Sequence, residues 1–358
     1  MTKPKYRKMF AYATIISAFL LSGCGLLGGE KKEEVDPPKE VTMTSEEQGS
    51  VGKTDKEETK KGEKEAATES TVKTELYLLD KNGLVVSQTL NLAKTESVAK
   101  QALQHLVENG PVTDMLPNGF KAVLPEDTKL TVNVKDGVAT VDFSKEFKNY
   151  QPEDELKILQ SVTWTLTQFD TIDKVKLQMN GHPLEEMPVN GTPIGDNLSR
   201  KDGINLDISK SGDILNSRPI TVYYLSGEKE NYYFVPVTKR VSNKIDNNID
   251  AAIQELVKGP SANSELLNEF SPDVALLDKP KVENGNVILN FNESIYGSFD
   301  KKMISQNVLQ SLVLTLTEQT GIESVSITVN GKAELMNEEG GKLTEPVTRP
   351  EHVNTGSY

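Results

Sequence analysis

The single cysteine of the 358-residue chain, Cys24, is the side chain whose chemistry is most clearly set by its position. It ends the tetrad Leu21-Ser22-Gly23-Cys24, which closes the uncharged run 9–21. Four basic residues precede this run, which is too short to span a bilayer comfortably. A basic start, a short apolar core and small residues after it are typical of a secretory signal peptide. The thiol is therefore expected at the point of cleavage.

The tetrad resembles the bacterial lipoprotein box, in which the cysteine is acylated and the peptide is cut just before it. The resemblance implies a signal peptide over 1–23 and fatty acyl chains, palmitate among them, on Cys24. Two or three acyl chains hold a protein on a bilayer where one chain does not. We therefore expect an anchor on the extracytoplasmic face of the cell membrane. The alternative is a plain secretory peptide with an incidental thiol.

Other chemistry is sparsely represented in the sequence. It contains no G-x-S-x-G, P-loop, paired-cysteine or H-E-x-x-H pattern, and three histidines in all. A lone cysteine also excludes an intrachain disulfide and a multi-cysteine metal site. We therefore expect no enzymatic activity, no cofactor and no metal.

The charge of the chain limits its partners. The formal net charge is −13, and removal of the signal peptide with its four cations would make it −17. Binding to nucleic acid needs a basic footprint, so we expect no nucleic-acid partner. Anionic lipid would also repel such a chain, so the acyl anchor must hold it at the bilayer.

The residues after residue 71 contain one sequence twice. Segments 158–181 and 308–331 share ten identities in 24 positions without a gap. Two shorter pairs recur upstream in the same order: 102–111 with 252–260, and 136–143 with 284–291. The alignment offset is constant within each segment and changes by one or two residues between segments. This indicates two domains whose elements are packed and whose loops vary in length.

Periodicity predicts the elements of each domain. Apolar residues spaced by three or four positions predict two helices in each domain. Alternation of apolar and polar residues predicts a hairpin between the helices and a last strand that ends at Asn-Gly. A further strand pair precedes each copy. The helices fall at 98–107 and 159–169, then at 249–257 and 309–316, and the last strands at 175–179 and 325–329. The predicted class is α+β, with two tandem copies of a two-layer helix-strand-strand-helix-strand domain, each a small antiparallel or mixed sheet with helices on one face.

Composition sets the remaining boundaries. Residues 25–71 have no aromatic residue and are rich in Lys, Glu, Thr, Ser and Gly, which predicts a disordered acidic tether. The predicted organisation is a signal peptide 1–23, lipidated cysteine and tether 24–71, first domain 72–190, linker 191–218, second domain 219–340 and polar C-terminal tail 341–358.

The duplication tests the candidate catalytic groups, because a site that served the original domain is expected in both copies. His105 aligns with Glu255, and His182 with Lys332. The third histidine, His352, lies in the polar tail. The carboxylate pair Asp142 and Glu146 aligns with Asn290 and Ser294, which cannot perform the same acid–base work. None of these groups is expected to be catalytic.

Two threonines do recur, as Thr165 and Thr167 in the first copy and Thr315 and Thr317 in the second. Their hydroxyls could line a ligand groove, or they could hydrogen-bond to preceding helix carbonyls. Trp164, which the second copy replaces with leucine, is interpreted as a core or groove-filling residue.

An aromatic cluster distinguishes the second copy. Tyr223, Tyr224, Tyr232, Tyr233 and Phe234 fall on its first hairpin, and alternation sends them to both faces. Exposed tyrosines are favoured in protein interfaces and as platforms for sugars. We therefore take Tyr224, Tyr232 and Tyr233 as a candidate interface. The alternative is that the hairpin packs on its own domain or on its neighbour.

Residues 72–350 resemble two GerMN domains. The resemblance rests on two copies of A-x-Q-x-L-V followed by Gly-Pro, then paired strands, S-x-x-x-T-L-T and a strand that ends in Asn-Gly. It implies a fold akin to the ring-building motif of secretion and sporulation channel proteins. It also implies a role in sporulation and spore germination, with channel components between mother cell and forespore as partners.

The expected function is a non-catalytic, membrane-anchored scaffold of the spore envelope and channel machinery. Its expected location is the space between the mother-cell and forespore membranes, where its partners are the lipid bilayer, envelope or channel proteins, and other copies of itself. The alternative is a ligand-binding module that holds peptidoglycan fragments or a small germination signal between the helices and the sheet. The aromatic hairpin and a possible crevice between the domains motivate it.

Overall fold

The computed structural model describes residues 71–207, 215–228 and 231–356. Cys24 and the three residues Leu21, Ser22 and Gly23 before it lie outside the described residues, as do the signal peptide and nearly all of the predicted tether. Among the described residues, no helix is long and apolar enough to cross a bilayer.

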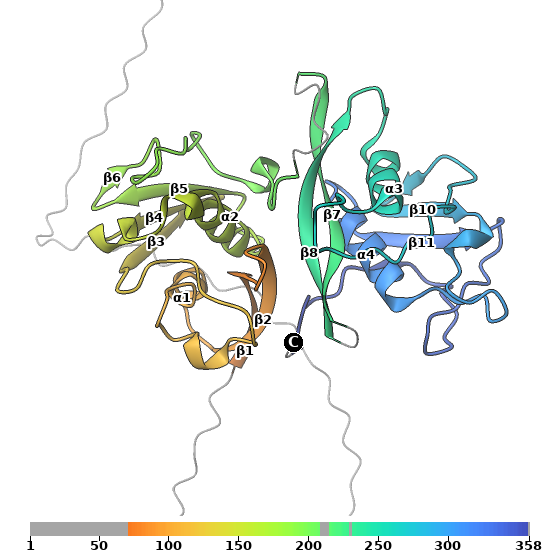
Figure 1. Ribbon diagram of the computed structural model, residues 1–358, viewed down its shortest axis with the longest axis horizontal. Coiled ribbons are helices and arrows are strands. Elements are labelled where there is room, and N and C mark those ends of the chain that lie inside the picture. Colours follow the sequence, from red (N-terminus) through yellow and green to blue (C-terminus); the bar gives the residue numbers. More distant parts are fainter. Residues whose placement is uncertain (1–70, 208–214, 229–230, 357–358) are drawn as a thin grey trace, which may run out of the picture. The chain divides into compact units, whose positions relative to one another are not determined.

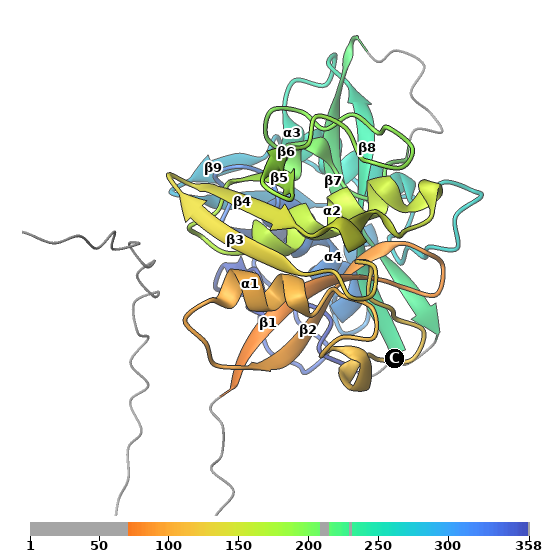
Figure 2. The same cartoon turned by 90° about the vertical axis from the view of Figure 1, so that its left-hand side faces the viewer.

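The first repeat joins a two-stranded ribbon to a small mixed sheet (Figure 1). In the sheet the order is β3-β4-β5-β6, where β3 and β4 are antiparallel and β4 and β5 are parallel. The two strands of the β3–β4 hairpin run side by side in both views (Figure 2). The elements are β1 (Thr71–Leu79), β2 (Val85–Ala93), α1 (Val98–Gln104), β3 (Leu130–Lys135), β4 (Val138–Phe143), α2 (Glu155–Leu166), β5 (Lys174–Met179) and β6 (His182–Pro183).

The second repeat has the same order of elements, with a longer ribbon of two twelve-residue strands. Its mixed sheet has the order β12-β11-β10-β9, in which β10 and β11 are parallel. The elements are β7 (Ser217–Glu228), β8 (Asn231–Ser242), α3 (Asn248–Lys258), β9 (Lys281–Glu283), β10 (Asn286–Phe291), α4 (Gln306–Thr317), β11 (Ser324–Val329) and β12 (Val347–Thr348). The predicted α+β class, the tandem copies and the extra strand pair are therefore confirmed.

Alternation along the central strands builds the core of each repeat. In β4 the buried positions are Ala139, Val141 and Phe143, and in β10 they are the equivalent Val287, Leu289 and Phe291. The second helix of each repeat contacts both its mixed sheet and its ribbon, so α2 touches β1 and β5 while α4 touches β7 and β11. Apolar residues therefore point inward from three elements at once, and their burial stabilises each repeat.

Asparagine and glycine close the last long strand of each repeat, as predicted. Asn180 and Gly181 have φ angles of 51° and 79°, and Asn330 and Gly331 have 49° and 74°. These two residue types adopt the left-handed region at little cost, which explains why the same pair ends both strands.

The segments predicted as linker and tail pack against the repeats. Leu198, in the linker, exchanges two backbone hydrogen bonds with Val175 of β5, at 2.9 and 2.8 Å. At the equivalent place in the second repeat, Val347 pairs with Val325 of β11. Further along, Ile204 is fully buried and Val353 is 3% exposed. Both segments therefore extend their repeat by a short edge strand and continue into the core.

Candidate functional site

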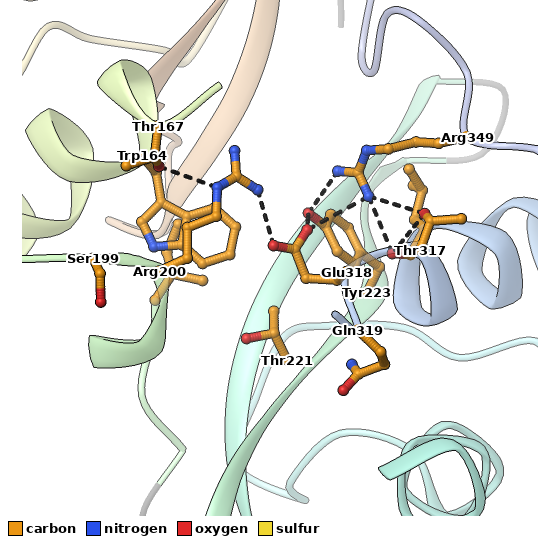
Figure 3. A network of polar contacts seen from close by, with 12 residues as sticks. Trp164, Thr167, Ser199, Arg200, Thr221, Tyr223, Thr317, Glu318, Gln319 and Arg349 are labelled. Atoms are coloured by element: carbon orange, nitrogen blue, oxygen red, sulfur yellow. Dashed lines mark hydrogen bonds and ion pairs between the residues drawn. The ribbon is translucent and has the colours of Figure 1, made fainter. Parts of the chain in front are cut away.

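Three charged side chains meet at the junction of the two repeats (Figure 3). Arg200 comes from the segment after the first repeat, Glu318 from the C-terminal end of α4, and Arg349 from the residue after β12. Arg200 Nη1 donates a hydrogen bond of 2.9 Å to Glu318 Oε1, and Arg349 Nη1 lies 3.5 Å from Glu318 Oε2. The Glu318 side chain is 10% exposed, so a nearly buried carboxylate bridges two guanidinium groups.

Aromatic rings hold the two arginines in place. The Arg200 guanidinium lies 4.4 Å from the centre of the Trp164 ring, and that of Arg349 lies 5.3 Å from the centre of the Tyr223 ring. The Tyr223 hydroxyl donates to Glu318 Oε2 at 3.1 Å and accepts from Arg349 Nη2 at 3.0 Å. Cation–π contacts of this kind gain strength where water is partly excluded, and the Arg200 and Arg349 side chains are 28% and 27% exposed.

Electrostatics keep the bridging carboxylate ionised. Burial alone would raise the pKa of Glu318, but Arg200 and Arg349 outweigh it and hold that pKa below its ordinary value. The opposite holds for Glu75 on β1, where burial outweighs the more distant Arg349 and raises the pKa. A carboxylate with a lowered pKa is a poor general acid near neutral pH, and guanidinium groups do not deprotonate in proteins. Glu318, Arg200 and Arg349 therefore link separate elements of the fold and do not form an acid–base pair.

The recurring threonines serve the same role in both repeats. Thr165 Oγ1 accepts a hydrogen bond from the backbone N–H of Tyr77 at 3.0 Å, and Thr315 Oγ1 accepts one from that of Tyr223 at 2.9 Å. Both threonines are fully buried. Each therefore ties its helix to the first strand of its ribbon, and its hydroxyl is not available to line a ligand groove.

Thr165 and Thr315 thus follow neither predicted behaviour, whereas Thr167 and Thr317 follow one of the two. Thr167 donates to the carbonyl of Thr163 at 2.8 Å, and Thr317 donates to that of Val313 at 2.7 Å. The prediction that these hydroxyls bond to preceding helix carbonyls is confirmed. The two hydroxyl oxygens also accept hydrogen bonds from arginines: Thr167 Oγ1 from Arg200 Nε at 3.1 Å, and Thr317 Oγ1 from Arg349 Nη1 at 3.3 Å.

The expected exposure of the aromatic hairpin needs correction. Tyr224 is 1% exposed and Tyr233 is 3% exposed, while Tyr232 is partly buried. The Tyr224 hydroxyl donates to the backbone carbonyl of Glu255 at 2.8 Å, inside the second repeat. The Tyr233 hydroxyl donates to Asp80 Oδ2 of the first repeat at 2.9 Å. By the strand register, Tyr224 and Tyr233 lie on the same face of the ribbon, so this face is covered by its own repeat and by the first repeat together.

The residues discounted as catalysts have structural roles. Asp142 Oδ1 accepts from the backbone N–H of Gly181 at 2.9 Å, and Asn290 Oδ1 accepts from that of Gly331 at the same distance. The change from aspartate to asparagine therefore preserves one turn contact. His105 Nδ1 lies 2.8 Å from the carbonyl oxygen of Gln101, within its own helix. Among the described residues, no group of three or more His, Cys, Asp or Glu side chains could hold a metal ion.

Sequence reasoning missed Asn205, which lies in the predicted linker. Its side-chain amide donates to the carbonyl of Val85 on β2 at 2.7 Å and to that of Pro236 on β8 at 2.8 Å. Its Oδ1 accepts from the Val85 N–H at 2.8 Å. One asparagine therefore bonds to the ribbons of both repeats.

The predicted tail contains a second residue of this kind, Asn354, which is 7% exposed. Its amide donates to the carbonyls of Ser87 on β2 and Phe234 on β8, at 2.8 and 2.9 Å, and its Oδ1 accepts from the Phe234 N–H at 2.8 Å. The sequence does hold a signal for both asparagines. Arg200 precedes Asn205 by five residues, and Arg349 precedes Asn354 by five.

Comparison with known proteins places this geometry in a family. Residues 75–185 and 221–334 match the Germane family, described as sporulation and spore germination. The chain is 58% identical over 353 residues to the spore germination protein GerM of Bacillus subtilis (strain 168), covering 96% of each sequence. It is also similar to the solved structure of the tandem GerMN domains of the sporulation protein GerM from Bacillus subtilis. That similarity has 61% identity and a TM-score of 0.76, and covers 80% of this chain and 100% of that one. The chain thus belongs to the Germane family of sporulation and spore germination proteins.

Proposed function

We propose that this chain is a lipid-anchored, extracytoplasmic scaffold that acts without catalysis during sporulation and germination. Cys24 provides the anchor, the residues after it provide reach, and the paired repeats present sheet edges to envelope or channel proteins. The observation that supports a role without catalysis is the pairing of the charged groups at the junction. Glu318 pairs with both Arg200 and Arg349, as expected for a structural contact between the repeats.

The anchoring half rests on the lone cysteine at the end of a signal-peptide pattern. In a spore-forming host, the Cys24→Ala chain should move from the membrane fraction to the soluble fraction, and spore formation or germination should be impaired. The matched control is the same variant fused to an unrelated membrane anchor, which should restore the phenotype. Normal spores from the fully soluble variant would refute the need for anchoring.

The scaffold half rests on the terminal strands of the mixed sheets. β3 is the last strand on one side of the first sheet, and β9 occupies the same place in the second. Thr131 and Asn133 on β3 are exposed, in contrast to the buried tyrosines of the ribbon. An accessible strand edge can pair with a strand of another protein. We assign β3 as the edge that meets channel components between mother cell and forespore, or a second copy of the chain.

Photocrosslinking in sporulating cells tests this assignment. A crosslinking residue at Thr131 or Asn133 should capture envelope channel proteins or another copy of the chain. The same residue at exposed Glu96, in the loop before α1, is the control and should capture little. Equal capture from all three positions, or adducts to glycan alone, would contradict the scaffold role.

A ligand-binding function remains the second candidate because two open hollows flank α3. One, of about 480 Å³, is lined by apolar residues such as Ile253 and Val257 together with the charged Asp250 and Lys258. The other, of about 310 Å³, is smaller. A ligand at a hundred times its dissociation constant stabilises a protein by about 2.7 kcal/mol. Thermal shift with muropeptides and germinants would detect such binding, and no shift with any of them would exclude these ligands.

A further inference from the structure

The two repeats contact each other through equivalent positions. Asn205 of the first repeat bonds to its own ribbon and to that of its neighbour, and Asn354 of the second does the same in reverse. Corresponding residues of the two contacts are 149 positions apart in the sequence: Asn205 and Asn354, Val85 and Phe234, Ser87 and Pro236. Such reciprocity, in which position i meets j and j meets i, defines an isologous contact about a two-fold axis. The junction is an internal dimer interface.

The same relation brings two positive charges together. Arg200 and Arg349 are also 149 positions apart, and each donates a hydrogen bond to an equivalent threonine, Arg200 to Thr167 and Arg349 to Thr317. Any pair of these repeats arranged about the two-fold axis therefore places two guanidinium groups at the junction. Two partly buried like charges held close together are unfavourable unless a carboxylate compensates them.

One position breaks the symmetry and supplies that carboxylate. Glu318 of the second repeat corresponds to Gln168 of the first, 150 positions earlier. Gln168 bonds within its own repeat, where its Oε1 accepts from the N–H of Glu75 at 2.9 Å. Glu75 is the other acidic group nearby, but among the described contacts no ion pair joins it to either arginine, and burial raises its pKa.

We propose that Glu318 determines which repeats pair with each other. The junction surface binds a second domain of the same fold only where one of the two domains has a carboxylate at the position of Glu318, in contact with both arginines. In a pair of two first repeats, two copies of Arg200 would lie at the junction. Both positions equivalent to Glu318 would then hold the uncharged Gln168. The mixed pair within one chain has Glu318 in direct contact with both guanidinium groups. The duplication therefore specifies pairing between unlike repeats and disfavours association of first repeats from two chains.

The Glu318→Gln substitution tests this in the full chain carrying Cys24→Ala. The variant should unfold at a lower urea concentration than the parent chain. Backbone amides of β2, β8 and residues 353–356 should exchange hydrogen about tenfold faster or more, as expected for the loss of charge-assisted hydrogen bonds. Emission of Trp164, the single tryptophan, should shift because Arg200 loses the partner that holds it over the ring. The control is Glu323→Gln, which removes an exposed carboxylate five residues later.

A rescue separates pairing from ordinary packing. Under the two-fold relation, a carboxylate at position 168 faces the same two arginines from the other repeat. The Gln168→Glu and Glu318→Gln double variant should therefore recover at least half of the lost urea midpoint and slow the exchange again. If Glu318→Gln alone yields no folded chain, recovery of folded chain in the double variant becomes the readout. An unchanged midpoint and exchange in Glu318→Gln, or no recovery in the double variant, would overturn the proposal.

Discussion

The two repeats keep the same backbone contacts but differ in the charges at their junction. In both, a buried threonine of the second helix accepts from the first strand of the ribbon, at 3.0 Å in one and 2.9 Å in the other. At the end of that helix, Gln168 bonds to its own strand, whereas Glu318 binds arginines from both repeats. The comparison teaches that the fold depends on hydrogen bonds repeated in each copy, and that the charges at the junction of the copies differ at one position, Glu318 against Gln168.

The largest effect is expected at Trp164, whose counterpart in the second repeat is the equally buried Leu314. Trp164→Ala should lower the free energy of unfolding by about 3–5 kcal/mol, because it leaves a cavity and removes the surface on which Arg200 stacks. Trp164→Leu, which installs the residue of the second repeat, should cost clearly less. Urea denaturation followed by circular dichroism measures both. Equal losses in the two variants would show that the repeats do not share this packing position.

The twin asparagines provide the next test. Asn205→Ala and Asn354→Ala each remove three hydrogen bonds to the ribbons and leave buried backbone groups unpaired, so each should cost about 1–3 kcal/mol. The two-fold relation predicts losses of similar size. Lys201→Ala, at an exposed position in the same segment, is the control. A large loss from one asparagine with none from the other would contradict an isologous junction.

Local periodicity predicted the elements of each repeat well, because their apolar faces repeat within a few residues. Phe143 and Phe291, for example, mark strand ends that alternation alone located. The burial of Tyr233 and Asn354 could not be predicted in this way. Tyr233 bonds to Asp80, 153 residues away, and Asn354 bonds to Ser87, 267 residues away, so neither contact leaves a local pattern.

The candidate site was predictable only in part for the same reason. The recurring threonines were found because they lie within the aligned segments. Thr167 and Thr317 followed one of the two predicted behaviours, whereas the bonds of Thr165 and Thr315 to the ribbon were not predicted. The arginines and asparagines of the junction lie after loops of different length, where the gapless alignment had already ended. Extending the alignment past those loops would have found Arg200 with Asn205 and Arg349 with Asn354.

A pH-dependent difference between the repeats is expected at the start of their second helices. The first repeat has Glu155 there, 1% exposed, and its carboxylate accepts from the backbone of Asn190 at 2.6 Å and of Thr192 at 2.9 Å. Burial raises its pKa, but these hydrogen bonds outweigh it and lower the pKa to about 2. The second repeat has Ser305 at this position.

Since the folded state lowers this pKa, Glu155 contributes stability that is fully present above its ordinary value of 4.5 and is lost as the pH falls toward 2. Glu155→Gln should therefore cost about 1–3 kcal/mol at pH 7 and much less at pH 2.5, measured by urea denaturation at both values. Ser305→Ala is the matched control in the second repeat and should show a smaller dependence on pH, because the Ser305 hydroxyl donates to the exposed carboxylate of Glu269 at 2.7 Å. A loss in Glu155→Gln that is equal at both pH values would refute an ionised carboxylate in this role.

The smallest effect is expected where the two repeats already carry interchangeable residues. Asp142 and Asn290 each accept from the backbone N–H of the glycine that follows the last strand, both at 2.9 Å. Asp142→Asn retains the accepting oxygen, so the free energy of unfolding should change by no more than about 0.5 kcal/mol. Asp142→Ala removes the acceptor and should cost more, by about 0.5–1.5 kcal/mol, although the site is partly open to water. If asparagine proved as damaging as alanine, the carboxylate would be doing something that Asn290 does not, and the acid–base role rejected for Asp142 would have to be reconsidered.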